Sequence, residues 1–382
     1  MLQYPLRATG NRLAAERDVT LRETRTESFR ALQGRILSIM HPSLYSRPDE
    51  GGASPPQSPL VDLGRWLAGA GYQFVTVTPA THARVNARPA SLEAHSVEDV
   101  FGWNRPFSES LLPGAVLQML RQADAVAVRD GMLVSRVRFA TLNDRIYVHS
   151  AFPTREPDAV FFGPDTYRFA TLIRRALAAD PMPAGGVMVD MGCGAGAGGI
   201  VAAGATAAAS SLILADINPA ALRYARINAA LAGVGARFQC GDLFSGVAGP
   251  VDLIVANPPY MVDPQARLYR DGGGALGSAL SMRIVREGLA CLAPAGRLIL
   301  YTGSPIVRGK DLLKEAIEMA IAGTGVSCAY AELDPDVFGE ELEMPAYHDV
   351  DRIAAVGAIL TARAPAALQV VATFNGLIQD LK

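Results

Sequence analysis

The sequence has few of the side chains that commonly bind metals or form disulfides. Its 382 residues include four cysteines and five histidines. The cysteines form no C-x-x-C pair and the histidines no ligand pattern, so neither a zinc site nor a disulfide framework is indicated, and we expect no bound metal. Reduced, buried thiols are the default for scattered cysteines, and the histidines are expected to be structural or exposed. These residues are Cys193, Cys240, Cys291 and Cys328, and His41, His82, His95, His149 and His348.

Lysine is also scarce, so nearly all the positive charge comes from arginine. Only Lys310, Lys314 and Lys382 are lysines, and the formal net charge is -2. Proteins that hold nucleic acid by bulk electrostatics usually carry a clear excess of Lys and Arg. The composition disfavours that class of protein, although it leaves room for a local basic face.

No segment has the pattern of a secretory signal or a membrane span. Met1–Arg7 is followed by many charges and has no apolar core. Met191–Ala215 lacks charged residues, but it is dominated by Gly and Ala and includes Ser210 and Ser211. We therefore expect a cytoplasmic protein that has no membrane partner.

Length and composition predict a globular protein of two domains. Half of the residues are hydrophobic and 19% are charged, which is typical of a chain with a sizeable interior. A chain this long exceeds one typical core. We expect an N-terminal α+β domain for substrate recognition over residues 1–155 and a second domain over residues 156–382.

The first of these domains is expected to contain helices followed by strands. Helical spacing of apolar residues predicts helices over Leu21–Met40, Leu60–Ala70 and Leu111–Gln122, and the Pro-, Gly- and Ser-rich Arg47–Pro59 predicts a loop. Three short runs rich in Val, Ile and Phe follow, separated by the turn-forming pairs Asp130-Gly131 and Asn143-Asp144. A small antiparallel meander after helices suits a winged-helix-like module. The alternative is a cap without a nucleic-acid role.

In the second domain, apolar runs alternate with helical segments. Buried strands are expected at Gly186–Met191, Ser211–Ala215, Val251–Ala256 and Arg297–Thr302. Such alternation implies a mostly parallel, doubly wound sheet with helices on both faces, which is a Rossmann-like α/β fold.

A glycine-rich turn follows the first of these strands. The run Met191-Gly192-Cys193-Gly194-Ala195-Gly196 lets the backbone turn sharply and approach a ligand. Gly194-x-Gly196-x-x-Gly199 also fits the dinucleotide fingerprint, so an NAD-binding oxidoreductase is an outside alternative. Asp190, just before the turn, could meet an ammonium group, which a pyrophosphate ligand would not favour.

Acidic residues also end the next two strands. Asp216, in Asp216-Ile217-Asn218-Pro219, lies about 20 residues beyond the glycine turn, where a carboxylate can accept bonds from ribose hydroxyls. Asp242, in Gly241-Asp242-Leu243-Phe244, could accept from an adenine amino group while its apolar neighbours cover the ring. Alternatively, Asp242 is a helix cap or turn residue.

The strand at Val251–Ala256 runs into Asn257-Pro258-Pro259-Tyr260. Two prolines impose a rigid, extended turn that lacks backbone donors, so the Asn257 amide and the Pro258 carbonyl can serve as fixed acceptors. Tyr260 adds a flat ring beside them.

In this order the motifs resemble those of class I S-adenosylmethionine methyltransferases. The Asn-Pro-Pro-Tyr turn resembles that of enzymes acting on amide or exocyclic amino nitrogens, among them the HemK-type glutamine methyltransferases of release factors and the adenine and guanine amino-methyltransferases of nucleic acids. The resemblance covers roughly residues 158–362. Phe161–Tyr167 is similar to the stretch that helps to close the cofactor pocket in HemK-type enzymes.

The resemblance implies S-adenosylmethionine as cofactor and N-methyl transfer as activity. It implies that Asp190 and the glycine loop hold the methionine portion, Asp216 with its neighbours Ile217 and Asn218 the ribose side, Asp242 and Leu243 the adenine, and Asn257, Pro258, Pro259 and Tyr260 the acceptor nitrogen. The expected acceptor is a protein glutamine, with an RNA or DNA base as the alternative. Tyr269–Gly274 departs from the usual HemK sequence. This segment could form a flexible lid or a surface turn.

Overall fold

The computed structural model describes residues 58–206 and 210–363. The helix predicted over Leu21–Met40 and most of the loop predicted over Arg47–Pro59 lie outside these residues. The described residues belong to one compact unit, Pro56–Lys382. The domain boundary predicted near residue 155 falls inside this unit and stays a prediction. Within the described ranges, no helix is both long and apolar enough to cross a membrane.

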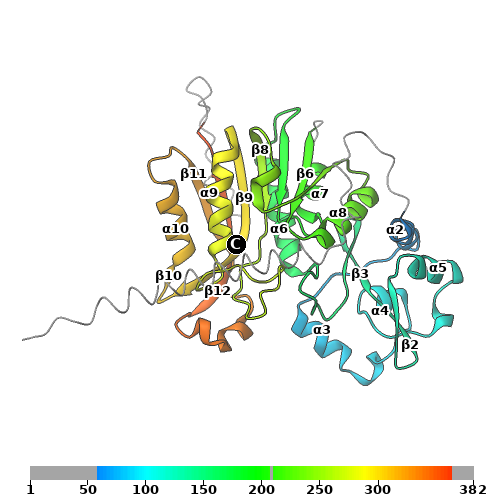
Figure 1. The fold of residues 1–382 in the computed structure, drawn as a ribbon. Coiled ribbons are helices and arrows are strands. Elements are labelled where there is room, and N and C mark those ends of the chain that lie inside the picture. The colour runs from blue at the N-terminus through cyan, green and yellow to red at the C-terminus, as the bar shows by residue number, and fades with distance from the viewer. Residues whose placement is uncertain (1–57, 207–209, 364–382) are drawn as a thin grey trace, which may run out of the picture. The chain divides into compact units, whose positions relative to one another are not determined.

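The first elements of this unit are short helices and two hairpins (Figure 1). They are α2 (Pro59–Gly69), α3 (Pro79–Asn86), η2 (Pro89–Ser91), α4 (Val97–Phe101), η3 (Glu109–Leu111), α5 (Gly114–Gln122), β1 (Val126–Arg129), β2 (Met132–Ser135), β3 (Val137–Leu142) and β4 (Arg145–Ser150). Helix α2 confirms the prediction over Leu60–Ala70. Helix α5 begins later than the predicted Leu111, because Pro113 holds the preceding backbone in an extended conformation.

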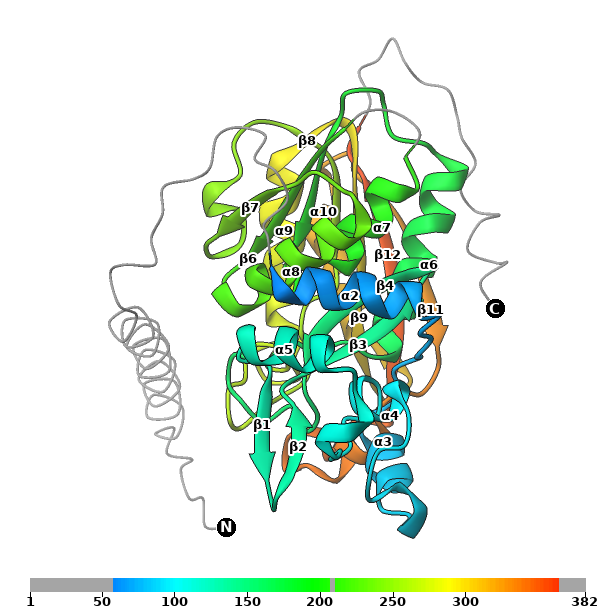
Figure 2. The same cartoon turned by 90° about the vertical axis from the view of Figure 1, so that its right-hand side faces the viewer.

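The predicted meander is wrong in its strand count and pairing. Four strands form two separate antiparallel pairs, β1 with β2 and β3 with β4. The two turns are the ones predicted, since Asp130, Gly131, Asn143 and Asp144 all have positive φ, as a tight two-residue hairpin requires. Figure 2 shows the β1–β2 hairpin pointing away from the sheet and α2 lying beside α8.

The second part of the unit contains the α/β sheet and its helices. Its elements are α6 (Pro164–Ala179), β5 (Val187–Met191), α7 (Ala197–Gly204), β6 (Ser211–Asp216), α8 (Pro219–Ala232), β7 (Arg237–Cys240), η4 (Leu243–Gly246), β8 (Val251–Ala256), α9 (Ala279–Cys291), β9 (Leu292–Val307), β10 (Lys310–Asp311), α10 (Leu312–Ile321), β11 (Ser327–Asp334), η5 (Gly339–Glu343), η6 (Pro345–Tyr347) and β12 (Arg352–Thr361). All four predicted strands are present, and β9 is longer than predicted.

The sheet combines a parallel half with an antiparallel extension. The strand order is β11-β12-β9-β8-β5-β6-β7, with β10 paired to β9. Strands β7, β6, β5, β8 and β9 run parallel, whereas β10, β11 and β12 pair in the antiparallel sense. The chain goes from β5 outward to β6 and β7 and then returns to β8 on the other side of β5. The crevice at the carboxyl ends of β5 and β8 is therefore the topological switch point, where ligands bind in open α/β sheets.

Helices cover both faces of the sheet, as the strand-helix alternation predicts. Along β8, Leu253 and Val255 join the hydrophobic cluster that includes α6, α7 and α8, while Ile254 and Ala256 join the cluster that includes α9 and α10. This alternation is the period of two expected of a strand buried on both sides. Figure 1 shows α9 and α10 on one side of the sheet and α7 and α8 on the other.

Candidate active site

The glycine turn and the Asn-Pro-Pro-Tyr turn lie next to each other at the carboxyl edge of the sheet. Met191 pairs with Ala215 on one side and with Ala256 on the other. The following residues, Gly192 and Asn257, therefore leave adjacent strand ends. The Gly192 N–H donates to the Ala215 carbonyl at 2.9 Å, which holds the start of the turn against β6.

The glycine turn leaves open space beside its backbone. Gly192, Gly194 and Gly196 have φ of 69°, 52° and 79°, a region that residues with a Cβ rarely adopt. A Cβ at Gly192 would have no atom within 4 Å, and one at Gly194 would have only Val160, at 3.9 Å. A ligand can thus approach the backbone here, and the Val160 contact brings the segment before Phe161 against the turn.

Asp216 joins the glycine turn to the start of α8. One carboxylate oxygen accepts from the Gly194 N–H and the other from the Asn218 N–H, both at 2.8 Å. Burial raises the pKa of Asp216, although these backbone donors oppose that effect. The side chain stays partly exposed at the strand end, so its oxygens can meet a ligand that enters the crevice.

Asp190 lies deeper than Asp216. Its side chain is 1% exposed, and its Oδ2 accepts from the Gly199 N–H at 2.7 Å. Burial, reinforced by the nearby Asp216 carboxylate and opposed by the Gly199 donor, raises the pKa of Asp190 to about 7. As placed, Asp190 supports the backbone at the start of α7, and its contact with a cofactor stays a prediction.

Of the neighbours of these aspartates, Ile217 is best placed for an external ligand. Ile217 is 40% exposed, which is unusual for a large apolar side chain. Asn218 is buried and caps α8, accepting from the Ala220 N–H at 2.9 Å and donating to the Asp158 carbonyl at 2.8 Å. Asn218 therefore shapes the site from beneath.

Asp242 and Leu243 differ sharply in exposure. Asp242 lies just before η4 and accepts from Arg283 at 3.1 Å in a half-exposed ion pair. Leu243 has a φ of 45° and is buried in the core. Asp242 occupies the turn position that the alternative interpretation described, and an adenine contact remains a prediction for both residues.

The Asn257 amide has unused hydrogen-bonding capacity. Its side chain is half-buried, and within residues 58–206 and 210–363 no group hydrogen-bonds it. The next two residues, Pro258 and Pro259, cannot donate through their backbone. The Asn257 side chain and the Pro258 carbonyl therefore form a polar pair on a stiff turn beside the glycine loop.

Tyr260 is held by a buried network that sequence reasoning missed. Its hydroxyl donates to Asp165 Oδ2 at 2.5 Å, and the Tyr301 hydroxyl donates to Asp165 Oδ1 at 2.8 Å. Arg168 approaches the same carboxylate at 3.3 Å. Burial raises the pKa of Asp165, whereas the two tyrosines and Arg168 lower it. The Asp165 carboxylate thus fixes the Tyr260 ring and joins α6 to β9.

The Tyr260 ring occupies space that a glycine leaves free. A Cβ at Gly303 would lie 2.2 Å from Tyr260 Cδ2, so β9 accepts the ring only because this residue has no side chain. The Phe338 ring packs edge-on against the Tyr260 ring, with 6.1 Å between the ring centroids and 67° between the ring planes. Tyr260 is therefore 7% exposed and fixes the end of the Asn257 turn, while its contact with an acceptor stays a prediction.

The segment after Tyr260 is fastened at several points. The Met261 N–H donates to the Arg270 carbonyl at 3.1 Å, and the Tyr269 hydroxyl donates to the Thr154 carbonyl at 2.7 Å. The Tyr269 ring also stacks on Phe161 at 6.3 Å. In this structure the segment that includes Tyr269–Gly274 packs against residues 154–161 rather than standing free.

Cysteine exposure corrects one sequence-based expectation. Cys193 is buried, but Cys240 is exposed and Cys291 and Cys328 are partly exposed. Cys240 ends β7, which is the edge strand of the sheet, so burial as a default is wrong there. Across the described part of the chain, no three His, Cys, Asp or Glu side chains are grouped as metal ligands.

Part of the chain is similar to known methyltransferases. Residues 170–320 match the family model Methyltransferase small domain. The release factor glutamine methyltransferase of Deinococcus radiodurans is 36% identical over 166 residues, which cover 40% of this chain and 55% of that protein. That of Cereibacter sphaeroides is 35% identical over 148 residues, which cover 35% of this chain and 52% of that protein.

A relative named for a different substrate is also similar to this chain. The ribosomal RNA small subunit methyltransferase C of Chromohalobacter salexigens is 32% identical over 122 residues, covering 32% of this chain and 33% of that protein. The chain thus spans about half the length of the two release factor relatives. The sheet order and the glycine turn at the switch point lie within or next to residues 170–320, the segment that is similar to the Methyltransferase small domain.

Proposed function

We propose that this chain is an S-adenosylmethionine-dependent N-methyltransferase that acts on a planar amide nitrogen, the side chain of a protein glutamine. The observation that carries the proposal is that the Asn257 amide beside the open glycine turn has no hydrogen-bond partner among the described residues. The relatives named release factor glutamine methyltransferase support this choice of acceptor.

The crevice residues fit a bound S-adenosylmethionine, which supplies an activated methyl group on a sulfonium. The space at Gly192 and Gly194 would admit the methionine portion close to the backbone. The partly exposed Asp216 carboxylate would accept from the ribose hydroxyls, and exposed Ile217 would cover one face of the adenine. Asp242 and Leu243 would border the other end of the ring.

The acceptor turn would act on the nitrogen by hydrogen bonding and positioning. An amide lone pair is delocalised, so the nitrogen is a poor nucleophile while it stays planar. The Asn257 side-chain oxygen and the Pro258 carbonyl would accept from the amide N–H groups and favour the geometry and charge of the transition state. Alignment of reacting groups can itself contribute about 7 to 11 kcal/mol.

Methylation of an exocyclic amino group on an RNA or DNA base is the second candidate. The same two acceptors would serve such a nitrogen, because its lone pair is delocalised into the base ring. The relative named for ribosomal RNA methylation supports this candidate over a shorter match. The methyltransferase family match favours both candidates over the NAD-dependent alternative.

The test is transfer of labelled methyl groups by the purified full chain. Release factor, ribosomal RNA and genomic DNA are offered separately with S-adenosylmethionine labelled in the methyl group. We expect label in the protein and, after digestion, on a glutamine nitrogen. Label only in nucleic acid would select the second candidate, and label in none of them, with cofactor bound, would contradict the proposal.

A paired variant tests the role of Asn257. Asn257→Ala should retain cofactor binding by calorimetry and lose methyl transfer by about 100-fold or more, as removal of a single transition-state hydrogen bond does elsewhere. Gln122→Ala, which removes an exposed amide at the end of α5, is the matched control. Unchanged turnover in Asn257→Ala would show that the acceptor turn is wrongly assigned.

A further inference from the structure

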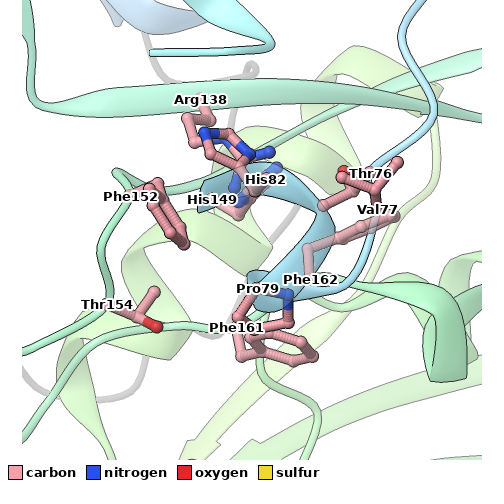
Figure 3. A pocket seen from close by; sticks show the side chains of 10 residues that line it. All are labelled: Thr76, Val77, Pro79, His82, Arg138, His149, Phe152, Thr154, Phe161 and Phe162. Carbon is pink, nitrogen blue, oxygen red and sulfur yellow. The ribbon is translucent and has the colours of Figure 1, made fainter. Parts of the chain in front are cut away.

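A pocket between α3, β3 and β4 gathers three nitrogen-bearing side chains. Arg138 of β3, His149 of β4 and His82 of α3 line it together with Phe152, Phe161 and Phe162. Figure 3 shows the three nitrogen-bearing side chains at the same end of the pocket. Each is at least 96% buried by area, since the exposed fractions are 4%, 1% and 1%. We call this site the Arg138 pocket.

Each of these side chains has a buried nitrogen without a hydrogen-bond partner. The atoms are Arg138 Nη2, His82 Nδ1 and His149 Nε2, and the statement holds for the residues that the structure describes. A buried polar atom left unpaired costs about 1 to 3 kcal/mol, and more if it is charged. Three such atoms in one pocket indicate that a polar group from outside completes them.

Arg138 is the strongest of the three indications. Its Nε donates to the Gly102 carbonyl at 2.8 Å, and its guanidinium lies over the Phe74 ring at 5.8 Å. In the described ranges no carboxylate forms an ion pair with it. Burial lowers the pKa of Arg138 to about 10, so the group remains a cation near neutral pH. A buried cation without a counter-charge calls for an anion.

The two histidines offer acceptors rather than donors. His82 Nε2 meets the Trp103 carbonyl at 2.8 Å, and His149 Nδ1 meets the Ser150 carbonyl at 3.1 Å. A carbonyl only accepts, so these nitrogens carry the ring protons. Burial, with Arg138 next in effect, lowers the pKa of His82 to about 4 and that of His149 well below its usual value. Each neutral ring therefore keeps a bare lone pair, on His82 Nδ1 and on His149 Nε2.

We propose that the Arg138 pocket binds a phosphate group that still carries a proton, as inorganic hydrogen phosphate or as the end of a phosphate monoester. Its charged oxygens accept from Arg138, and its P–OH group donates to His82 or His149. A fully deprotonated oxyanion supplies only acceptors and would leave the imidazole lone pairs unmatched. Phosphate monoesters have a second pKa of about 6, so the protonated form is available near neutral pH.

The size and rim of the pocket suit the end of a larger molecule. The pocket has about 290 Å³ of open space when its mouth is counted, and its enclosed part takes roughly one water-sized group. A ligand therefore enters with one edge of its phosphate and keeps the remainder in the mouth. Phe152, Phe161 and the partly exposed Thr154 form that mouth, which favours a small organic monoester over the free ion.

Binding of four anions to the full chain tests the proposal. Inorganic phosphate, glycerol phosphate, sulfate and dimethyl phosphate are titrated by calorimetry near neutral pH, without cofactor. We expect phosphate and glycerol phosphate to bind, the monoester more tightly, and sulfate and the diester to bind at least about tenfold more weakly. Sulfate binding as tight as phosphate binding would overturn the proposal, as would no phosphate binding by the folded chain, which would leave one ordered water as occupant.

Two variants separate a ligand site from a structural cluster. Arg138→Gln should abolish phosphate binding and its stabilising effect on thermal unfolding, whereas the neighbouring Arg136→Gln, in an exposed pair with Asp124, should bind as the parent does. If Arg138→Gln does not fold, His82→Phe serves instead. It keeps a ring against Phe152, and Asn86 still donates to the Trp103 carbonyl at 2.8 Å. Parent-like binding in Arg138→Gln would overturn the proposal, as would parent-like binding by His82→Phe combined with His149→Phe, which removes both acceptors open to the P–OH group.

Discussion

The carboxyl edge of the sheet and the Arg138 pocket treat buried charge in opposite ways. Asp190 and Asp216 are both matched by backbone N–H groups of the loops that surround them. Arg138, His82 and His149 each keep one nitrogen without a partner among the described residues. In the first region the buried carboxylates are matched by the fold itself. The second is incomplete as folded, which is why the structure itself points to an occupant there.

The largest expected effect comes from breaking the match at Asp216. Asp216→Ala leaves the Gly194 and Asn218 N–H groups without an acceptor and removes the proposed ribose acceptor. Affinity for S-adenosylmethionine should fall about 100-fold, because two hydrogen bonds to the charged Asp216 carboxylate are lost. Calorimetric titration measures the change, with the exposed Asp62→Ala of α2 as control. Parent-like affinity would exclude Asp216 from the cofactor site.

A smaller effect is expected where one of two hydroxyl donors is removed. Tyr260→Phe leaves Asp165 with Tyr301 and Arg168 only, so the free energy of unfolding should fall by about 1 to 3 kcal/mol. Urea unfolding measures it. Tyr224→Phe, for which the described structure gives no hydroxyl hydrogen bond, is the control and should change stability little. An equal loss in both variants would mean that the Asp165 network contributes nothing specific.

A change in pH dependence is expected at Asp190. Its pKa rises from 3.8 to about 7 in the folded protein, so between these values the folded state binds the extra proton. Its contribution to stability is therefore present at low pH and is lost as pH rises from about 4 to about 7, by at most about 1.4 kcal/mol per pH unit. Asp190→Asn should flatten that part of the profile. Unfolding curves across the range decide, and an unchanged slope would contradict the assignment.

Local sequence patterns sufficed for the parallel half of the sheet and for the turns. The strands at Val187–Met191 and Val251–Ala256 are apolar except for one aspartate each and have turn residues nearby, and Asp130-Gly131 and Asn143-Asp144 meet the backbone demands of hairpin turns. These features depend on neighbours in the chain. The antiparallel strands β10, β11 and β12 were not predicted, although Ile353–Leu360 of β12 is a largely apolar run. Their place in the sheet depends on pairing between strands, which a local pattern does not give.

The site divides along the same line. That Asp190, Asp216 and Asn257 share one edge of the sheet could be predicted. Each lies at or next to the end of a strand, and the carboxyl ends of parallel strands meet at one edge. The Asp165 network joins residues that are 95 and 136 positions apart. Only the burial of the Asp165 carboxylate in the folded core makes these hydrogen bonds important. Side-chain packing of this kind follows from the folded core. The sequence indicated it only through the Phe161–Tyr167 stretch, which contains Asp165.

Gly303 has a consequence for which substitutions this protein can tolerate. Even the methyl group of alanine would meet the Tyr260 ring at 2.2 Å, so position 303 admits no side chain while position 260 holds an aromatic ring. The residues tolerated at the two positions are therefore coupled, although position 260 lies on a turn and position 303 inside a strand. A library randomised at both would recover larger residues at 303 only together with smaller ones at 260, and lineages could leave this arrangement only through a paired change.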